Sequence, residues 1–319
     1  MKNTKIYIVF LLAFFITGLP VLAQESKKGK SDFPILKGSY LGQTPPEYKS
    51  EVFAPNFVST KYGELNSVFT PDGREFYFSR RGVPGKPSAI MVSRMIDNVW
   101  TTPAPVNFTG TFSDIDLFIT HDNKSMIFCS NRPHKKGEIM KIDHDFWISK
   151  NDGNKWAEPV LFAKEALSDF EDYFPVLTKS GNLYFNSQRE SPGTNNIFMS
   201  QFVNGKYTTA KKIPEPINSA YREFDAFISY EEKMIIFSSE RPDGFGRADI
   251  YVSFKKSDNS WTQPLNLGND INSDASEYGS TISPDGKYFF YTSNKNGSED
   301  IYWVSTEIIE DLKPKNLIK

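Results

Sequence analysis

The sequence predicts an all-β protein built as a single β-propeller, and two observations lead to that fold. One pattern recurs five times at intervals of roughly fifty residues, which is enough chain for a four-stranded propeller blade. No stretch shows sustained helical periodicity; short runs of β-branched and aromatic residues alternate instead with turns rich in Gly, Pro, Asp and Asn. Each copy carries one marker serine, and these are Ser79, Ser130, Ser187, Ser239 and Ser293.

Each repeat contains the same elements in the same order. An acidic residue opens an apolar strand, a turn follows, and an aromatic strand then ends in Ser-x-Arg or a near equivalent. The turn is clearest at residues 70–73 and 283–286, where Pro-Asp-Gly predicts a tight reversal. A third strand comes next, as at residues 145–149, and then a hairpin that carries an aromatic residue and usually a proline. The aromatic positions are Trp100, Trp156, Tyr207 and Trp261.

The two ends of the repeat array predict how the ring closes. The last repeat has its first three strands only, whereas an extra segment at residues 51–55 precedes the first repeat. We expect this segment to supply the outer strand of the C-terminal blade, because an unpaired blade edge is unfavourable. This closure gives five four-stranded blades. Six blades are the alternative if residues 40–62 contain further strands.

The N-terminus has the features of a secretory signal peptide. Lys2 and Lys5 form a basic start, residues 6–17 are almost wholly apolar, and small residues precede a predicted cleavage site at Gln24. An uncleaved N-terminal anchor is the alternative, but the apolar run is shorter than a bilayer span requires. We therefore expect an exported protein, periplasmic or secreted, with no membrane span after cleavage.

The expected domain boundaries follow from these two patterns. The signal peptide covers residues 1–23, a flexible leader covers residues 24–40, and the propeller domain covers residues 41–319.

Composition excludes several classes of function. The chain has 37 Lys and Arg against 39 Asp and Glu. Nucleic-acid-binding proteins carry basic stripes, so no nucleic-acid partner is expected. The single cysteine, Cys129, cannot form an internal disulfide and lies in an apolar strand pattern. The histidines, His121, His134 and His144, do not have the spacing of a zinc site, and we predict neither a metal nor a cofactor.

The repeat pattern resembles a known family. Residues 281–293 read Thr-Ile-Ser-Pro-Asp-Gly-Lys-Tyr-Phe-Phe-Tyr-Thr-Ser, and residues 69–79 are the next clearest copy. This pattern is similar to the TolB-like or WD40-like propeller repeats of bacterial envelope proteins, over about residues 50–305. The resemblance implies the propeller fold. It implies no particular chemistry, because propellers of this type serve as scaffolds, as polysaccharide-handling proteins and as enzymes.

Charged residues form the most regular polar feature of the repeats. In every copy one acid opens the first strand and one base closes the second strand. Adjacent strands would place them at the same end of a blade, where we expect them to form structural ion pairs. The alternative is a functional rim in which these charges bind a polar ligand such as a glycan or a peptide. The acids are Glu64, Asp114, Glu171, Glu223 and Glu277, and the bases are Arg81, Arg132, Arg189, Arg241 and Lys295.

Two aspartates depart from the repeat and are the candidates for catalysis. Asp116 and Asp225 lie two residues into the first strand of their repeats, where the other copies have Asn66, Tyr173 and Gly279. Glycan-cleaving hydrolases use two carboxyl groups, one as an acid and the other as a base or nucleophile. We predict a non-catalytic, monomeric binding or scaffold protein that recognises an envelope protein or polysaccharide. A glycan hydrolase or lyase that uses these two acids is the alternative.

Overall fold

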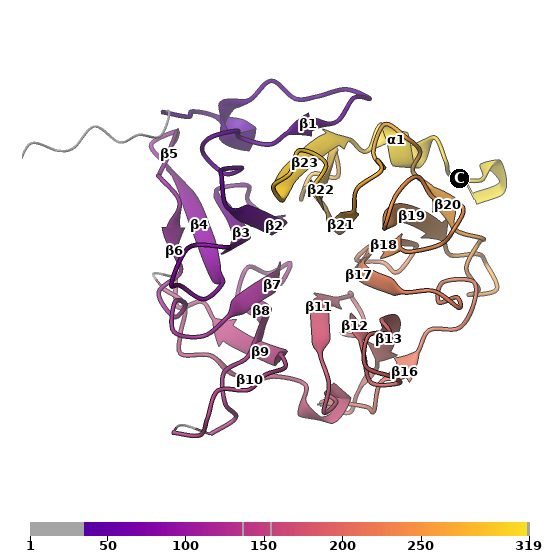
Figure 1. Ribbon diagram of the computed structural model, residues 1–319, viewed down its shortest axis with the longest axis horizontal. Coiled ribbons are helices and arrows are strands. Elements are labelled where there is room, and N and C mark those ends of the chain that lie inside the picture. Colours follow the sequence, from indigo (N-terminus) through magenta and orange to yellow (C-terminus); the bar gives the residue numbers. More distant parts are fainter. Residues whose placement is uncertain (1–34, 136, 154, 318–319) are drawn as a thin grey trace, which may run out of the picture. The chain divides into compact units, whose positions relative to one another are not determined.

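The protein is a five-bladed β-propeller. The computed structural model describes residues 35–135, 137–153 and 155–317. Within these residues, five antiparallel sheets are arranged around a central axis, and the first strand of each repeat lies nearest that axis (Figure 1). The predicted fold class and number of blades are therefore confirmed, and the six-bladed alternative is wrong.

Within each blade the strands follow one another from the axis outward, and the fifth blade takes its outer strand from the start of the chain. The first blade contains β2 (Gly63–Phe69), β3 (Glu75–Arg81), β4 (Ala89–Ile96) and β6 (Ala104–Pro105), with β5 (Val99–Trp100) paired to the end of β4. The second contains β7 (Asp114–Ile119), β8 (Ser125–Ser130), β9 (Asp145–Lys150) and β10 (Val160–Leu161). The third contains β11 (Asp172–Leu177), β12 (Leu183–Ser187), β13 (Asn196–Ser200) and β16 (Lys211–Lys212). The fourth contains β17 (Glu223–Ile228), β18 (Met234–Ser239), β19 (Asp249–Phe254) and β20 (Leu265–Asn266). The fifth contains β21 (Glu277–Ile282), β22 (Tyr288–Ser293), β23 (Asp300–Ser305) and β1 (Glu51–Val52).

A few short elements lie outside the blades. A two-stranded hairpin is formed by β14 (Phe202–Val203) and β15 (Lys206–Tyr207), and the helical turns are η1 (Ser39–Gly42), η2 (Lys164–Ala166), α1 (Glu307–Glu310) and η3 (Lys315–Leu317). None of the helices in the described part of the chain is long and apolar enough to cross a membrane.

The aromatic second strand of each blade is buried on both faces because every sheet lies between two neighbours. In β3, Phe76 and Phe78 pack in one core cluster with Phe290 of the fifth blade, whereas Tyr77, between them in the chain, packs in another cluster with Phe128 of the second blade. Successive side chains of a strand point to opposite faces, so one aromatic strand serves two interfaces between blades.

The N-terminal strand closes the ring, as predicted. β1 pairs antiparallel with β23, with Glu51 opposite Trp303. Phe53 follows directly and is fully buried, with its ring centroid 5.0 Å from that of Phe76 and 5.1 Å from that of Phe290. We call the segment of β1 and Phe53 the N-terminal clasp. It adds a strand to the fifth blade and an aromatic side chain to the contact of that blade with the first blade.

The predicted signal peptide at residues 1–23 lies outside the described residues, as does most of the predicted leader at 24–40. The last residues of that leader contact the first blade. The Trp100 backbone N–H donates to the Leu36 carbonyl at 2.9 Å, and its indole Nε1 donates to the Gly38 carbonyl at 2.7 Å.

Candidate functional site at the propeller axis

All five innermost strands contain a β-bulge. The pairing with the second strand shifts register at the same place in each blade, and one residue there has a φ between 48° and 67°. A positive φ favours Gly, Asn and Asp, because larger side chains clash with the backbone. Four of the five bulge residues belong to these types, and the third blade is the exception. The bulge residues are Asn66, Asp116, Phe174, Asp225 and Gly279.

This register corrects the sequence-based alignment of the third repeat. We predicted Glu171 as its opening acid and aligned Tyr173 with Asp116 and Asp225, whereas Asp172 is the buried acid and Phe174 is at the bulge. The Ser168 hydroxyl and N–H both bind Asp172 Oδ2, at 3.1 and 2.8 Å. A Ser or Thr four residues before the acid is thus the sequence signal that identifies Asp172, and three other blades carry it. These pairs are Thr60 with Glu64, Ser219 with Glu223 and Ser273 with Glu277.

Four of the five blades contain an ion pair between an acid of the first strand and a base that ends or follows the second, and two of these join the predicted residues, Asp114 with Arg132 and Glu223 with Arg241. Their carboxylates are fully buried, and the paired bases are largely so. A buried carboxylate requires such a partner, because its desolvation is otherwise uncompensated. The charges of these four pairs therefore neutralise each other within the blades. The pairs are Arg80 with Glu64 (2.7 Å), Arg132 with Asp114 (2.7 Å), Arg189 with Asp172 (3.0 Å) and Arg241 with Glu223 (3.5 Å).

Two predicted members of this set have other partners. Arg81 binds the carboxylate of Glu299, with its Nε 2.5 Å from Glu299 Oε2. Glu171 binds His144, with 3.1 Å between Oε2 and Nδ1. Because strands alternate their side chains, a shift of one residue turns a side chain to the opposite face. The neighbouring residues, Arg80 in the first repeat and Asp172 in the third, therefore occupy the positions inside the blades.

The fifth blade departs from the expected pairing. Lys295 makes no ion pair with Glu277 among the interactions of the described residues, and its Nζ lies 4.1 Å from the centroid of the Tyr302 ring. Glu277 Oε1 instead accepts hydrogen bonds of 2.6 Å from the hydroxyls of Ser273 and Ser293. Burial lowers the pKa of the Lys295 ammonium, against the opposing effect of the Glu277 charge.

Asp116 and Asp225 extend from the innermost strands of the second and fourth blades. The Asp116 N–H donates to Ser79 Oγ, and the Asp225 N–H donates to Asn186 Oδ1, each at 3.2 Å. Asp116 is buried and Asp225 is partly exposed. The preceding blade thus holds the backbone of each residue in place, and among the described residues no side chain donates a hydrogen bond to either carboxylate.

The two carboxyl groups influence each other. Burial, followed by the negative charge of Asp225, raises the pKa of Asp116 to about 8. Burial likewise raises the pKa of Asp225 to about 7. The positive charge of Arg81 lowers both pKa values, but by less than burial raises them. Interacting groups titrate as a pair, so together they retain roughly one proton near neutral pH.

Backbone geometry alone does not explain why these two positions are aspartate. Asn66 occupies the same position in the first blade, and its Oδ1 accepts a 2.8 Å hydrogen bond from the Leu117 N–H. Asparagine would therefore suit the positive φ without burying a carboxyl group, which is costly. Buried carboxyl groups with raised pKa values are frequent at functional sites. Asp116 and Asp225 remain the candidates for function.

Aromatic side chains surround the same end of the propeller, and the sequence analysis missed them. The loops that enter four innermost strands place an aromatic residue two positions before the buried acid; the fifth has Ala275 there. Two of these rings are well exposed, Phe170 at 40% and Tyr221 at 48%. An aromatic residue that recurs two positions before the acid was the sequence signal that could have identified these side chains. The four residues are Tyr62, Phe112, Phe170 and Tyr221.

A surface cavity of about 490 Å³ adjoins the exposed tyrosine. It lies between the third and fourth blades, and Tyr221, Arg222 and Lys212 contribute to its wall. Arg222 Nη1 binds Glu240 Oε1 at 2.6 Å, and Lys212 Nζ binds Glu190 Oε2 at 2.9 Å. The cavity therefore offers an aromatic face together with polar groups of both signs.

The described residues show no candidate metal site. The described residues contain no group of three or more His, Cys, Asp and Glu side chains that could hold an ion. His134 binds Asp145 at 2.7 Å and His144 binds Glu171, so these two histidines belong to separate contacts.

Comparison with known proteins supports the fold and leaves the chemistry open. No family model matches the sequence, and no curated protein matches it either. The resemblance to TolB-like repeats is therefore confirmed only as a likeness of fold.

Solved structures similar to this chain are propellers of different activity. A glycoside hydrolase has a TM-score of 0.54 at 14% identity, with 82% of this chain and 91% of that chain covered. A protein from Agrobacterium tumefaciens assigned as a TolB has a TM-score of 0.48 at 15% identity, over 73% of this chain and 71% of that one. An α-L-arabinofuranosidase from Lactobacillus brevis has a TM-score of 0.48 at 11% identity, over 73% and 84% of the two chains. At these identities the likeness extends to the fold alone.

Proposed function

We propose that this protein is an exported glycan-binding propeller that holds an envelope polysaccharide at the end of its axis where the innermost strands begin. We call this end the loop face. The observation that carries the proposal is the combination of exposed aromatic rings on this face with Asp225, a partly exposed carboxyl group that has no side-chain hydrogen-bond donor among the described residues and that the charge of Arg222 influences. Export is supported by the signal-peptide pattern of residues 1–23.

The chemistry of the loop face suits a sugar chain. Phe170 and Tyr221 present apolar rings on which the C–H face of a pyranose can stack, while hydroxyl groups of the sugar can donate to Asp225 and accept from Arg222. The cavity beside Tyr221 has room for one sugar unit between the third and fourth blades. Because the repeated acids and bases are paired inside the blades, they are not part of this proposed surface.

Hydrolysis of the bound glycan is a second candidate function, and one observation favours it. Asp116 and Asp225 both have raised pKa values and influence each other, so that near neutral pH the pair can offer one protonated and one ionised carboxyl group. In such a pair the acid gives its proton to the leaving glycosidic oxygen as the C–O bond breaks. The carboxylate takes a proton from the attacking water, which forms the new C–O bond.

Binding of purified envelope polysaccharides to the chain beginning at Gln24, followed by calorimetry, tests the proposal. Tyr221→Ala and Phe170→Ala should each weaken binding severalfold to about tenfold, since a stacking contact contributes on the order of 1 kcal/mol. Phe202→Ala is the matched control, because Phe202 is an exposed aromatic on the separate β14–β15 hairpin. If no polysaccharide binds, or if all three variants behave alike, the proposal is wrong, and capture of an envelope protein becomes the alternative.

Release of reducing ends from the same polysaccharides separates binding from hydrolysis. If the protein is a hydrolase, Asp116→Asn and Asp225→Asn should abolish release and keep binding within a few fold. If no reducing ends appear with any polysaccharide that binds, the second candidate is excluded and the first stands.

A further inference from the structure

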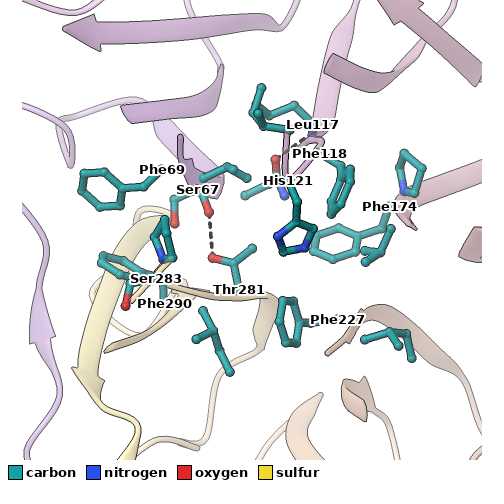
Figure 2. A pocket seen from close by; sticks show the side chains of 18 of the residues that line it. Ser67, Phe69, Leu117, Phe118, His121, Phe174, Phe227, Thr281, Ser283 and Phe290 are labelled. Carbon is teal, nitrogen blue, oxygen red and sulfur yellow. Dashed lines mark hydrogen bonds between the residues drawn. The ribbon is translucent and has the colours of Figure 1, made fainter. Parts of the chain in front are cut away.

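A second cavity lies at the opposite end of the axis, on the side of the Pro-Asp-Gly turns. Its volume is about 220 Å³, and its wall is formed by the later residues of the innermost strands and by the turns that follow them. Figure 2 shows residues from all parts of the ring around this space, including Ser67, Phe174 and Thr281. The Thr281 hydroxyl donates a 2.7 Å hydrogen bond to the Ser67 carbonyl and joins the fifth blade to the first at this wall.

Five phenylalanine rings line the apolar wall, together with aliphatic residues and prolines. Every blade contributes one ring, so the aromatic lining continues around the axis (Figure 2). The faces of such rings carry partial negative charge and attract cations. The five are Phe69, Phe118, Phe174, Phe227 and Phe290.

Charge in the cavity has one sign. Among the lining residues the groups that ionise are Asp116, His121 and Tyr230, and no Lys or Arg is included. Burial lowers the pKa of His121, which disfavours the charged imidazolium. Asp116, when ionised, is therefore the charge that a ligand in this cavity would meet.

The bulge of the third blade supports a role for the cavity. Phe174 is buried with a φ of 55°, whereas the equivalent positions hold Asn, Asp or Gly. A bulky residue in this region is strained, and such strain concentrates at ligand sites. At this position the strained backbone places an aromatic ring in the wall of the cavity beside Asp116.

An aromatic pair stands at the solvent side of the cavity. The His121 and Tyr230 rings come from the turns of the second and fourth blades, and their centroids are 3.8 Å apart. Both residues are exposed on their outer sides. The contact thus joins the second blade to the fourth at the wall of the cavity.

We propose that this cavity binds a small organic cation of the alkylammonium type, with Asp116 as the counter-ion and the phenylalanine rings as the walls. This site is distinct from the proposed glycan surface, although Asp116 faces the axis between them. A phosphate or carboxylate ligand lacks a Lys or Arg partner among the lining residues, whereas a cation supplies the counter-charge that the ionised form of Asp116 needs. A metal ion would need more oxygen ligands than one carboxylate supplies.

Binding of a cation should depend on pH, because it favours the ionised form of Asp116. The charged or titratable groups that act on Asp116 are Asp225, His144 and Arg81, and it acts in turn on Tyr173 and Cys129. Below the pKa of Asp116 each bound cation displaces one proton. Affinity should therefore rise about tenfold per pH unit, and level off above that pKa.

Calorimetric titration with three probes of similar size and different charge tests this inference. Tetramethylammonium should bind saturably, whereas tert-butanol and pivalate should bind at least about tenfold more weakly. Affinity for tetramethylammonium should increase from about pH 6 to about pH 9, with release of a proton at the lower pH. Equal binding of the three probes, tighter binding of pivalate, or affinity independent of pH would each overturn the proposal.

Two isosteric variants locate the counter-ion. Asp116→Asn should reduce affinity for tetramethylammonium by tenfold or more. The equivalent bulge of the first blade holds Asn66, so asparagine suits this backbone conformation. Asp225→Asn should retain binding and tighten it severalfold near neutral pH, because loss of the Asp225 charge lowers the pKa of Asp116. If Asp225→Asn abolishes binding while Asp116→Asn does not, the assignment of Asp116 is wrong. Phe227→Leu, which keeps an apolar wall, should weaken binding of the cation but not of tert-butanol.

The glycan experiments can fail independently of these. Binding of tetramethylammonium without binding of any polysaccharide would support the cavity alone, and the reverse result would support the loop face alone.

Discussion

Arg132 Nη2 donates a 2.7 Å hydrogen bond to Asp114 Oδ1 inside the second blade, and both side chains are buried. The guanidinium also lies 5.2 Å from the centroid of the Phe112 ring and 5.4 Å from that of Trp147. The base at the end of the second strand thus neutralises the acid and packs between aromatic rings. The same arrangement recurs around the ring with Arg189 and Arg241.

Removal of this arginine should be strongly destabilising. We expect Arg132→Ala to lower the free energy of unfolding by about 3–5 kcal/mol, because it leaves a buried carboxylate unpaired. Lys179→Ala is the control, since its pair with Glu231 is more than half exposed and solvent-exposed ion pairs contribute little to stability. Guanidinium denaturation measures both. A loss of similar size in the two variants would contradict the structural role of Arg132.

The N-terminal clasp should contribute a large part of the stability. Phe53→Ala removes a fully buried ring between the first and fifth blades and should cost about 3–5 kcal/mol. Phe245→Ala is the matched control, because Phe245 is 51% exposed. Thermal and chemical denaturation should separate the two variants clearly. If Phe53→Ala unfolds like the wild type, the ring does not depend on this closure.

The bulge of the fifth blade should tolerate only glycine without strain. A Cβ at Gly279 would lie 3.2 Å from Thr292 Oγ1, at a φ of +67°. We expect Gly279→Ala to cost about 1–3 kcal/mol. Gly286→Ala has a similar φ of +75° but meets nothing within 4 Å, so its cost should be smaller, at about 1 kcal/mol. Equal costs would show that crowding at the axis is unimportant.

Stability should fall with rising pH because of Asp116. Its pKa is raised in the folded protein, whereas an unfolded aspartate has a pKa of about 3.9. The folded state then holds more protons between these values, and the free energy of unfolding decreases as the pH rises through them. Asp116→Asn should therefore gain stability relative to the wild type, by more than about 1 kcal/mol at pH 8 and by little at pH 4.

A surface carboxylate provides the opposite sign for comparison. Asp122 accepts hydrogen bonds from the Thr120 hydroxyl and the Lys124 N–H, which lower its pKa. Its small contribution should be present at neutral pH and lost as the pH falls. Denaturation of Asp122→Asn across the same range should show this trend, and a trend like that of Asp116→Asn would contradict the argument.

Much of the architecture could be predicted because its signals are local. The Pro-Asp-Gly turn at residues 283–286 and the aromatic strand after it act through neighbouring residues of the chain. The partner of the strand near Glu51 was predictable because the fifth repeat lacks an outer strand, and the extra N-terminal segment can supply it. The ion pair between Asp114 and Arg132 was also predicted correctly, since adjacent antiparallel strands bring those positions together.

The site could be predicted only in part. Asp116 and Asp225 stood out as departures from the repeat, but the first and third repeats were each aligned one residue away from their actual register. Glu171 and Arg81 were therefore assigned to the blade interior and instead pair with other residues. A single-residue error of register exchanges the two faces of a strand, and periodicity of two residues cannot detect it.

Fold class, blade number and the closing strand were thus contained in the repeat, because turn chemistry and alternating side chains act over a few residues. The approach of Asp116 to Asp225 and the contact of His121 with Tyr230 join the second blade to the fourth. These contacts exist only when the ring is closed and every bulge is in register, since both conditions set which side chains meet at the axis.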